Sequence, residues 1–192
     1  MSEPDPPVNA ATVARLLAEQ LESRRQDYAL GGAIALGYWG APRGTVDVDL
    51  TVYLPPEKPA ECVGLLQDIG CEFSVTEAVE SLREHGFCRV RHAGMRVDVF
   101  LPIAPFYEAA RARRKRVELG GLPVIVWDAE SLAVFKMMFF RRKDLADVEE
   151  VLRSQGPAFD RVWVRRQLVE MYGERDPRLA AWDGLVQEIP ER

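Results

Sequence analysis

The chain has 192 residues, of which 47% are hydrophobic and 29% are charged, with a formal net charge of −5 and a pI near 5.2. This composition predicts a soluble globular protein that is long enough to bury the core of one domain. It excludes a chain-wide positive field that would attract nucleic acid or an anionic membrane, so any anionic ligand must be held by local basic residues.

Neither the cysteines nor the histidines have the spacing of a metal or redox motif. Cys62, Cys71 and Cys88 include no C-x-x-C pair, and His85 and His92 lack the four-residue helical spacing of a zinc pair. We therefore expect a reducing, cytoplasmic location. No apolar run approaches the roughly 20 residues that a membrane helix needs, so no membrane partner is expected.

The first part of the chain predicts a helix, a strand and a second helix after a short tail. The acidic, proline-rich segment 1–10 is typical of a disordered tail. Apolar residues at three- and four-residue steps predict an amphipathic helix over 11–25. A short strand at 27–30 and a short helix at 33–39 follow, on either side of two glycines.

The clearest strand pattern lies at residues 45–53, where apolar and polar residues alternate strictly. Such alternation predicts a strand with one buried face, because successive side chains point to opposite sides. The apolar positions on the buried side are Val46, Val48, Leu50 and Val52. The positions on the opposite side are Thr45, Asp47, Asp49, Thr51 and Tyr53.

The middle of the chain predicts two helices and a hairpin. Helical patterns at 55–70 and 75–86 precede two alternating runs, 87–92 and 95–101. An Ala-Gly turn joins the two runs, which is typical of a β-hairpin. Asp98 lies on the polar face of the second run.

The last part of the chain predicts mostly helix. A basic helix is expected at 105–119, followed by a short apolar strand at 122–127 and a long helix at 131–152. Beyond a break after this helix, the chain is expected to be helical to its end.

Three aspartates on polar strand faces predict a shared site. Asp47 and Asp49 are two residues apart, so they point to one side about 6.6 Å apart, and Asp98 joins them if the hairpin pairs beside their strand. Converging carboxylates repel one another unless cations neutralise them, and hard ions such as Mg²⁺ or Mn²⁺ prefer oxygen ligands. Two such ions clamp the attacking and leaving oxygens of a phosphoryl transfer. The alternative is that these aspartates are merely solvated.

Gly31 and Gly32 lie between a predicted strand and a predicted helix. Without side chains, such a turn lets backbone N–H groups and a helix N-terminus approach a triphosphate. The alternative is an ordinary turn.

The chain resembles the DNA-polymerase-β-like nucleotidyltransferase superfamily in three features that occur in the same order. They are the two glycines, the segment RGTVDVDL and the segment RVDVF. Residues 127–152, WDAESLAVFKMMFFRRKDLADVEEVL, are similar to the K-x(4)-R-x-x-D-x-x-D helix of small bacterial nucleotidyltransferases, including abortive-infection toxin-type members. Together the matches span about residues 28–152. The resemblance implies an α+β fold with a small mixed β-sheet flanked by helices, a nucleotidyltransferase domain at 11–152 and a helical C-terminal extension at 153–192.

The resemblance also implies roles for single residues. Asp47, Asp49 and Asp98 become metal ligands and catalytic carboxylates, with Asp98 placed to accept a proton from the attacking hydroxyl or to bind the catalytic metal. The residues implied to bind the nucleotide are Gly31, Gly32, Arg43, Thr45, Lys136 and Asp144. The implied cofactor is Mg²⁺ or Mn²⁺, and the implied substrate is a nucleoside triphosphate.

The helix at 131–152 has two interpretations. On a continuous helix, Lys136 and Asp144 lie about 12 Å apart along the axis and about 80° apart around it, so both can border one cleft. Alternatively, Arg141 with Asp144, or Lys143 with Asp147, form ordinary surface pairs that stabilise the helix slightly.

A basic run within the predicted helix at 105–119 is a candidate contact for an RNA or tRNA acceptor, because phosphate contacts supply sequence-independent affinity. The alternative is a solvated helix face. The run consists of Arg111, Arg113, Arg114, Lys115 and Arg116.

The leading functional hypothesis is a metal-dependent nucleotidyltransferase that moves NMP from an NTP to a hydroxyl on RNA, tRNA, a protein or a small molecule. The second hypothesis is a non-catalytic nucleotide-binding or antitoxin-like module of the same fold. A weaker third is an RNA-binding interaction protein that uses residues 111–116. The similarity to toxin-type members adds an antitoxin as a candidate partner.

Overall fold

The computed structural model of the chain describes residues 9–190, which divide into two compact units. We call them the sheet unit and the helical unit. The sheet unit comprises residues 9–30, 45–103 and 116–125. The helical unit comprises residues 31–44, 104–115 and 126–190.

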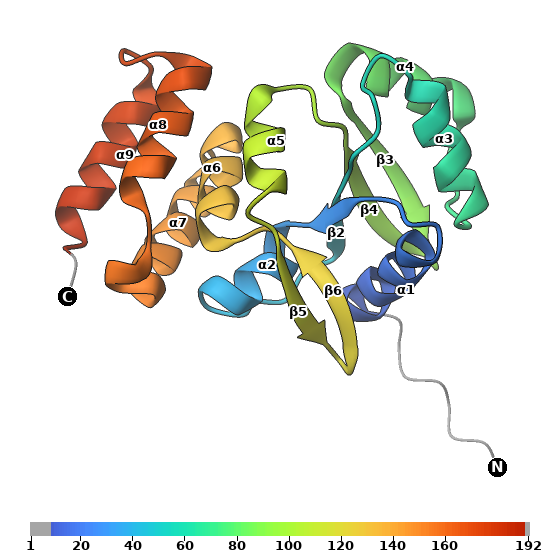
Figure 1. Cartoon of the computed structure of the whole chain (residues 1–192), viewed down its shortest axis with the longest axis horizontal. Helices are drawn as coiled ribbons and strands as arrows, with labels where there is room; N and C mark the ends of the chain where they lie inside the picture. Colours follow the sequence, from blue (N-terminus) through green and yellow to red (C-terminus); the bar gives the residue numbers. More distant parts are fainter. Residues whose placement is uncertain (1–8, 191–192) are drawn as a thin grey trace. The chain divides into compact units, whose positions relative to one another are not determined.

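The sheet unit contains three helices and the six described strands, apart from one end residue of β5 and one of β6 (Figure 1). Its helices are α1 (Ala10–Ser23), α3 (Pro59–Asp68) and α4 (Val75–His85). Its strands are β1 (Tyr28–Leu30), β2 (Asp47–Val52), β3 (Phe87–His92), β4 (Met95–Phe100), β5 (Lys115–Leu119) and β6 (Leu122–Val126), of which β5 begins and β6 ends in the helical unit.

The helical unit is built from the remaining elements. They are α2 (Gly32–Trp39), α5 (Pro105–Arg111), α6 (Ala129–Phe139), α7 (Arg142–Gln155), a 3₁₀ turn at Gly156–Ala158, α8 (Arg161–Tyr172) and α9 (Pro177–Glu188). These elements confirm the expected helices at 11–25 and 33–39 and the helical C-terminus. The tail expected at 1–10 lies outside the described residues apart from Asn9 and Ala10, where α1 begins.

The six strands that the structure describes form one mixed sheet in the order β3-β4-β2-β1-β6-β5. The α+β class with a small mixed sheet is therefore confirmed. β3 and β4 form the expected antiparallel hairpin, and β4 pairs with β2 in parallel. The hairpin turn is Ala93-Gly94, and both residues have positive φ, which matches the right-handed twist of the flanking strands.

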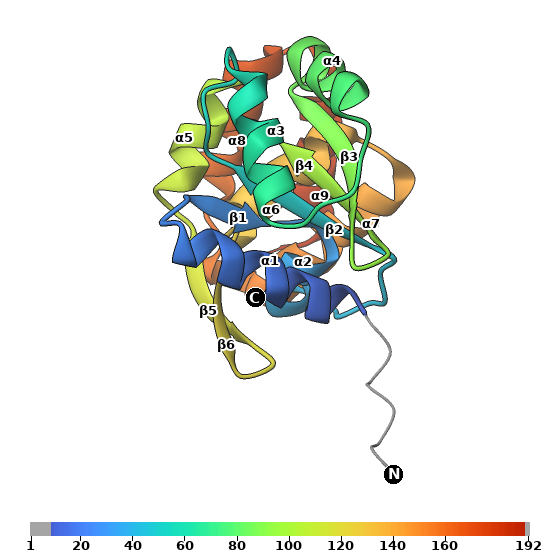
Figure 2. The ribbon, with the colours of Figure 1, turned by 90° about the vertical axis from the view of Figure 1, so that its right-hand side faces the viewer.

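One face of the sheet carries the apolar core of the sheet unit. Val48, Leu50, Val97 and Val99 are fully buried, and α1 and α3 lie on this side of the sheet (Figure 2). Both helices turn their apolar residues inward, among them Leu17 and Leu21 of α1 and Leu66 of α3. Burying each such side chain stabilises the fold by about 1.5–3 kcal/mol relative to leaving it exposed.

The prediction that β2 has a single buried face is wrong at both ends. Val46 precedes the strand and is 77% exposed, although the alternation placed it in the core. Thr51 and Tyr53, expected on the outward side, are buried. Only the first half of β2, with Asp47 and Asp49, alternates between a buried and a partly open face.

The basic helix predicted at 105–119 is also wrong, because α5 ends at Arg111 and β5 begins at Lys115. Gly120 and Gly121 both have positive φ and form the turn between β5 and its neighbour β6. Two adjacent glycines favour such a tight reversal, which pulls residues 115–119 into a strand.

The single helix predicted at 131–152 is two helices. α6 ends at Phe139, and Phe140 adopts a left-handed conformation with φ of 55°. α7 then begins with a capping box in which the Asp144 carboxylate accepts from the Arg141 backbone N–H. The cap at Asp144 thus marks the start of a separate helix. The apolar spacing of the sequence nevertheless continues from α6 into α7.

The helical unit has its own aromatic core. The rings of Trp127 and Phe135 lie 6.4 Å apart, and the Tyr107 ring meets the Phe135 ring edge-on at 6.2 Å. Phe159 and Trp182 form a second ring pair that joins the 3₁₀ turn to α9.

The predicted domain boundary between residues 152 and 153 stays a prediction. No helix within residues 9–190 is both long and apolar enough to cross a membrane.

Replacing Gly86 tests the packing at the end of α4. Gly86 has φ of 63°, and an added Cβ would collide with the Ile103 side chain, so Gly86→Ala should lower the free energy of unfolding by about 2 kcal/mol. Gly94→Ala is the matched control, because Gly94 also has positive φ but no atom lies near its added Cβ. Urea unfolding should show a loss of about 1 kcal/mol for the control; equal losses in both variants would refute the steric account.

Candidate active site

Two rows of charged residues cross one face of the sheet at β3, β4 and β2. In the first row, Arg91 lies opposite Arg96, which lies opposite Asp47. In the second row, Arg89 lies opposite Asp98, which lies opposite Asp49. Residues opposite one another in a ladder share a face, so three carboxylates and three guanidinium groups lie on one side of these strands. The hairpin therefore pairs beside β2 as the sequence required.

Arg96 lies between two of the three carboxylates. Its Nη2 donates to Asp47 Oδ2, and its Nε lies 3.6 Å from Asp98 Oδ1. Arg89 binds Asp98 from the other side through Nε at 2.8 Å and Nη2 at 3.3 Å. The hydrogen bonds and the charge of Asp98 raise the pKa of Arg89. Asp47 and Asp98 are thus neutralised by neighbouring arginines rather than left to repel one another.

Thr45, which the resemblance assigned to the nucleotide, contacts Asp47. Its hydroxyl donates to Asp47 Oδ1 at 2.5 Å and accepts weakly from the Asp47 backbone N–H at 3.4 Å. Because the Asp47 carboxylate is held from both ends, by Thr45 and by Arg96, its orientation is fixed. Thr45 therefore acts on the carboxylate in this structure, and a direct role toward the nucleotide stays a prediction.

The donor atoms on this face suit a hard divalent cation, because carboxylate oxygens are what Mg²⁺ and Mn²⁺ prefer. However, no three carboxylate, histidine or cysteine side chains within residues 9–190 are grouped so as to hold a metal ion. The guanidinium of Arg96 lies between two of the candidate ligands and contacts both Asp47 and Asp98. The chemistry of these oxygen donors fits such a metal, and the positive charge of Arg96 beside them opposes the binding of a second cation.

A second charged cluster lies in the helical unit around Lys136 of α6. Lys136 Nζ lies 2.7 Å from Asp147 Oδ2 and 3.7 Å from Asp144 Oδ1. Its side chain is 8% exposed and that of Asp144 is 0% exposed. The break between α6 and α7 turns α7 back so that these groups touch, which replaces the 12 Å axial separation predicted for a continuous helix.

Two arginines complete this cluster. Arg43 binds Asp147 in a bidentate manner, with Nε 3.2 Å from Oδ1 and Nη2 3.0 Å from Oδ2. Arg141 binds Asp144 in the same way, with Nε 2.6 Å from Oδ2 and Nη2 3.1 Å from Oδ1. Three cations thus face two carboxylates, so this cluster has an excess of positive charge.

Asp147 is the residue that the sequence interpretation underrated. It was weighed only as a surface partner of Lys143, yet it is buried and joins Lys136 to Arg43. Burial raises the pKa of Asp147, but hydrogen bonds from Arg43 and Lys136 and their positive charges outweigh burial, so the pKa is lowered. The D-x-x-D spacing after the lysine was the signal that could have identified it, because it puts Asp144 and Asp147 on one side of a helix.

Gly31 and Gly32 begin α2 in the helical unit. Gly32 has φ of 52°, a conformation that glycine adopts without steric cost. The Gly31 carbonyl accepts from the Ala35 backbone N–H at 3.0 Å, which closes the first helical turn. A helix start of this kind presents backbone N–H groups, which suits an anion.

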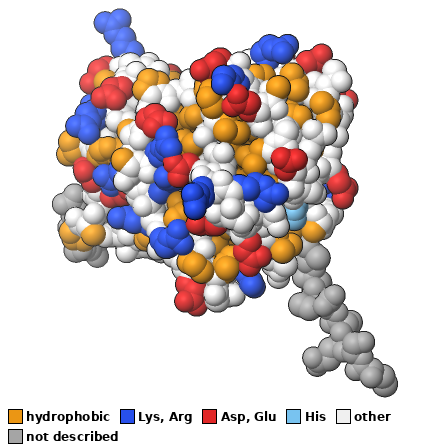
Figure 3. Space-filling view, turned by 45° about the vertical axis from the view of Figure 1, so that its right-hand side comes forward, with side chains coloured by type: hydrophobic (Ala, Val, Ile, Leu, Met, Phe, Trp, Pro, Cys, Tyr) orange, Lys and Arg blue, Asp and Glu red, His pale blue; other side chains and the backbone are white. Residues whose placement is uncertain are grey.

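The basic run at 111–116 does not form one helical face, since it spans the end of α5, a turn and the start of β5. Arg113 is bound to Asp128 at 2.6 Å and to Glu130 at 2.9 Å. Arg116 is bound to Glu22 at 3.1 Å. On the face in Figure 3, basic side chains are likewise interspersed with acidic ones.

The three thiols are not candidates for nucleophilic catalysis. Cys62, Cys71 and Cys88 are free cysteines in the described chain. Burial raises the pKa of each to about 12. Because the thiolate is the reactive form, these side chains stay unreactive near neutral pH.

Solved nucleotidyltransferase structures share the fold of this chain. An antigenic nucleotidyltransferase-like protein from Paracoccidioides brasiliensis is 20% identical, with 90% of this chain and 93% of that chain aligned at a TM-score of 0.53. The antibiotic-resistance factor ANT(2'')-Ia in solution is 14% identical, with 93% of both chains aligned at a TM-score of 0.54. ANT(2'')-Ia in complex with adenylyl-2''-tobramycin is 14% identical, with 91% and 97% aligned at 0.53. No protein-family model matches the chain, and no curated protein matches it in sequence.

Removing the charge of Arg96 should strengthen divalent-cation binding. Arg96→Met keeps the apolar stem and removes the cation that contacts Asp47 and Asp98, so we expect the affinity for Mn²⁺ to rise at least about tenfold. Electron paramagnetic resonance of free and bound Mn²⁺ measures this directly. Arg83→Met, on the exposed side of α4, is the control and should leave the affinity unchanged. An equal affinity in Arg96→Met and the wild type contradicts the assignment.

Asp147→Asn should destabilise the fold in a pH-dependent manner. The folded-state pKa of Asp147 is lowered, so its charge stabilises the fold above the unfolded pKa near 3.8, and this contribution is lost as pH falls through the folded value. We expect a loss of about 2 kcal/mol at pH 7 that shrinks below about pH 4. Thermal unfolding from pH 7 to pH 3 measures the gap, with Asp68→Asn as an exposed control. A gap that stays constant would show that the Asp147 charge contributes nothing.

Proposed function

We propose, from the premise that the chain has the nucleotidyltransferase fold, that it transfers an NMP group from a nucleoside triphosphate to a hydroxyl acceptor. The observation that carries this proposal is the parallel pairing of β2 with β4, which puts Asp49 directly opposite Asp98 and Asp47 two residues away on the same face. Three carboxylates on adjacent strands are the ligand set that two-metal phosphoryl transfer uses. The adenylyl-2''-tobramycin bound to ANT(2'')-Ia is a precedent for a nucleotidylated acceptor on this fold.

In this proposal, Asp47, Asp49 and Asp98 would hold Mg²⁺ or Mn²⁺, and the ion would supply charge neutralisation at the triphosphate. The acceptor hydroxyl oxygen forms a bond to the α-phosphorus while the bond from that phosphorus to the bridging oxygen breaks, and pyrophosphate leaves. Asp98 takes the hydroxyl proton. Thr45 keeps the Asp47 carboxylate oriented through its hydroxyl.

The residues assigned to the nucleotide have physical support of different strength. Gly31 and Gly32 offer backbone N–H groups at a helix start. Arg43 and Lys136 carry the positive charge that a triphosphate requires, in a cluster with excess positive charge. Asp144 is fully buried and pairs with Lys136 and Arg141, so we assign it to positioning the lysine rather than to direct contact.

A non-catalytic nucleotide-binding module is the second candidate. Its specific support is Arg96, which already neutralises Asp47 and Asp98 and so provides a permanent cation within the chain. Titration with Mg²⁺ and each NTP separates the two functions: pyrophosphate release indicates the enzyme, whereas NTP binding without release across varied acceptors indicates the module. The toxin subtype and an antitoxin partner stay predictions from the sequence.

Asp49→Ala should abolish NMP transfer while the fold is retained. We expect the transfer rate to fall at least about 100-fold, because a carboxylate is lost from the set that would hold the metal. The assay incubates the protein with each α-labelled NTP and with cellular RNA, protein and small molecules, and circular dichroism checks folding. Asp68→Ala, which removes an exposed carboxylate of α3, is the matched control. Equal labelling by both variants would sink the catalytic assignment.

A further inference from the structure

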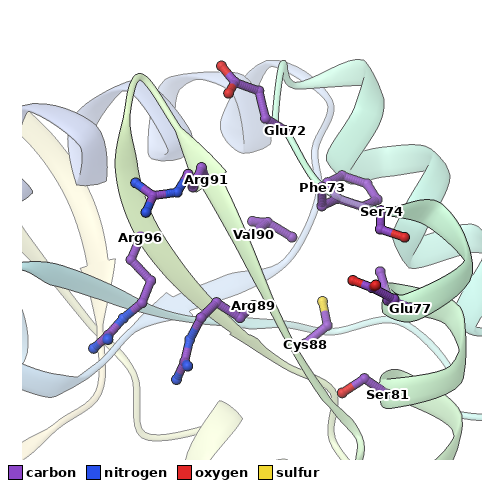
Figure 4. A pocket seen from close by; sticks show the side chains of 11 residues that line it. Glu72, Phe73, Ser74, Glu77, Ser81, Cys88, Arg89, Val90, Arg91 and Arg96 are labelled. Carbon is purple, nitrogen blue, oxygen red and sulfur yellow. The ribbon is translucent and has the colours of Figure 1, made fainter.

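A cavity of about 420 Å³ borders β3, the edge strand of the sheet. Phe73, Ser74 and Glu77 line it on the side of α4. Arg89 and Arg96 also line it, and their side chains extend to the opposite side of the hairpin (Figure 4). The cavity is therefore lined by arginines that also contact the candidate catalytic carboxylates Asp47 and Asp98.

Arg91 differs from the other two arginines that line this cavity, because it forms no ion pair with a described carboxylate. Its Nη1 donates to the Gly94 carbonyl oxygen at 2.8 Å. Glu72 lies directly opposite Arg91 in an isolated antiparallel bridge, but within residues 9–190 no ion pair joins the Arg91 guanidinium to a carboxylate. Arg89 and Arg96, by contrast, are bound to Asp98 and Asp47. Even so, Arg96 Nε is buried without a hydrogen-bond acceptor within residues 9–190. An unpaired guanidinium and an unused donor on neighbouring strands fit an anionic group such as a phosphate.

This positive group lies close to the candidate carboxylates. Arg91 is opposite Arg96, and Arg96 is opposite Asp47, so two strand spacings of about 4.8 Å separate the backbones of Arg91 and Asp47. A single ligand anchored at Arg91 therefore reaches the carboxylate row.

The other side of the cavity offers a partner for an aromatic ring. Phe73 is partly exposed and lines the cavity beside Ser74. Aromatic side chains stack on nucleic-acid bases, while arginines hold the phosphates. Glu77 lies on the Phe73 side, apart from the guanidinium groups of Arg89 and Arg96 (Figure 4), whereas Glu72 is the cross-strand neighbour of Arg91.

We propose that this cavity is the acceptor subsite and that the acceptor is a phosphate-bearing nucleotide or oligonucleotide, with its phosphate at Arg91 and its base at Phe73. The inference rests on the proposed function and specifies its acceptor.

Binding of two phosphate-bearing probes tests the subsite without any turnover. Fluorescence anisotropy measures the affinity of the full chain for a labelled ten-nucleotide single-stranded RNA, and competition with AMP measures the affinity for a mononucleotide. Arg91→Glu should weaken RNA binding about tenfold and flatten its salt dependence. Phe73→Ala should weaken binding of either probe without changing the salt dependence. Arg83→Glu makes the same charge change on the exposed side of α4 and is the matched control.

The outcomes separate this inference from the proposed function. Arg91-dependent binding supports the subsite, and a preference for RNA over AMP identifies a strand rather than a free nucleotide as the acceptor. Equal weakening by Arg91→Glu and Arg83→Glu overturns it, because only net charge would then matter. Efficient NMP transfer to an aminoglycoside with no Arg91-dependent binding would also overturn the inference while leaving the nucleotidyltransferase function intact.

Discussion

The parallel pairing of β2 with β4 is the constraint on which the candidate site depends. Its register puts Asp49 opposite Asp98 and Asp47 opposite Arg96. Because side chains alternate along a strand, a shift of one residue would move Asp98 and Arg96 into the apolar core and bring valines onto the charged face. The buried valines on the other face therefore fix the positions of the carboxylates, so the core and the site are specified by the same register.

Both units neutralise carboxylates with cations of their own. On the sheet face, Arg96 and Arg89 bind Asp47 and Asp98, and in the helical unit Lys136 lies between Asp144 and Asp147. Removing one partner from such a buried set leaves an uncompensated charge, which is costly. These ion pairs keep acidic residues close together. They are also the contacts that the proposed metal and nucleotide would have to displace.

The sequence predicted the helices and strands in which apolar residues recur at one regular spacing. It missed those in which a cap or a turn interrupts the element while the apolar spacing continues. The alternation in β2, β3 and β4 was regular enough to place Asp47, Asp49 and Asp98 on one face. The apolar spacing through residues 131–152 concealed the break at Phe140, because the Asp144 cap acts through a backbone N–H and not through hydrophobic pattern. The sequence interpretation underrates Asp147 and gives Arg96 no role for a related reason. The contacts of both residues are with residues distant in sequence, such as Arg43 and Asp47.

The most direct measurement of the central claim is a crystal structure of the protein with Mn²⁺ and a non-hydrolysable NTP analogue, analysed by anomalous scattering. The account predicts an anomalous peak about 2.2 Å from carboxylate oxygens of Asp49 and Asp98, with the Arg96 guanidinium moved away from Asp47. Arg96 still bound to Asp47 and Asp98 at saturating Mn²⁺, with no anomalous peak on this face, would contradict it.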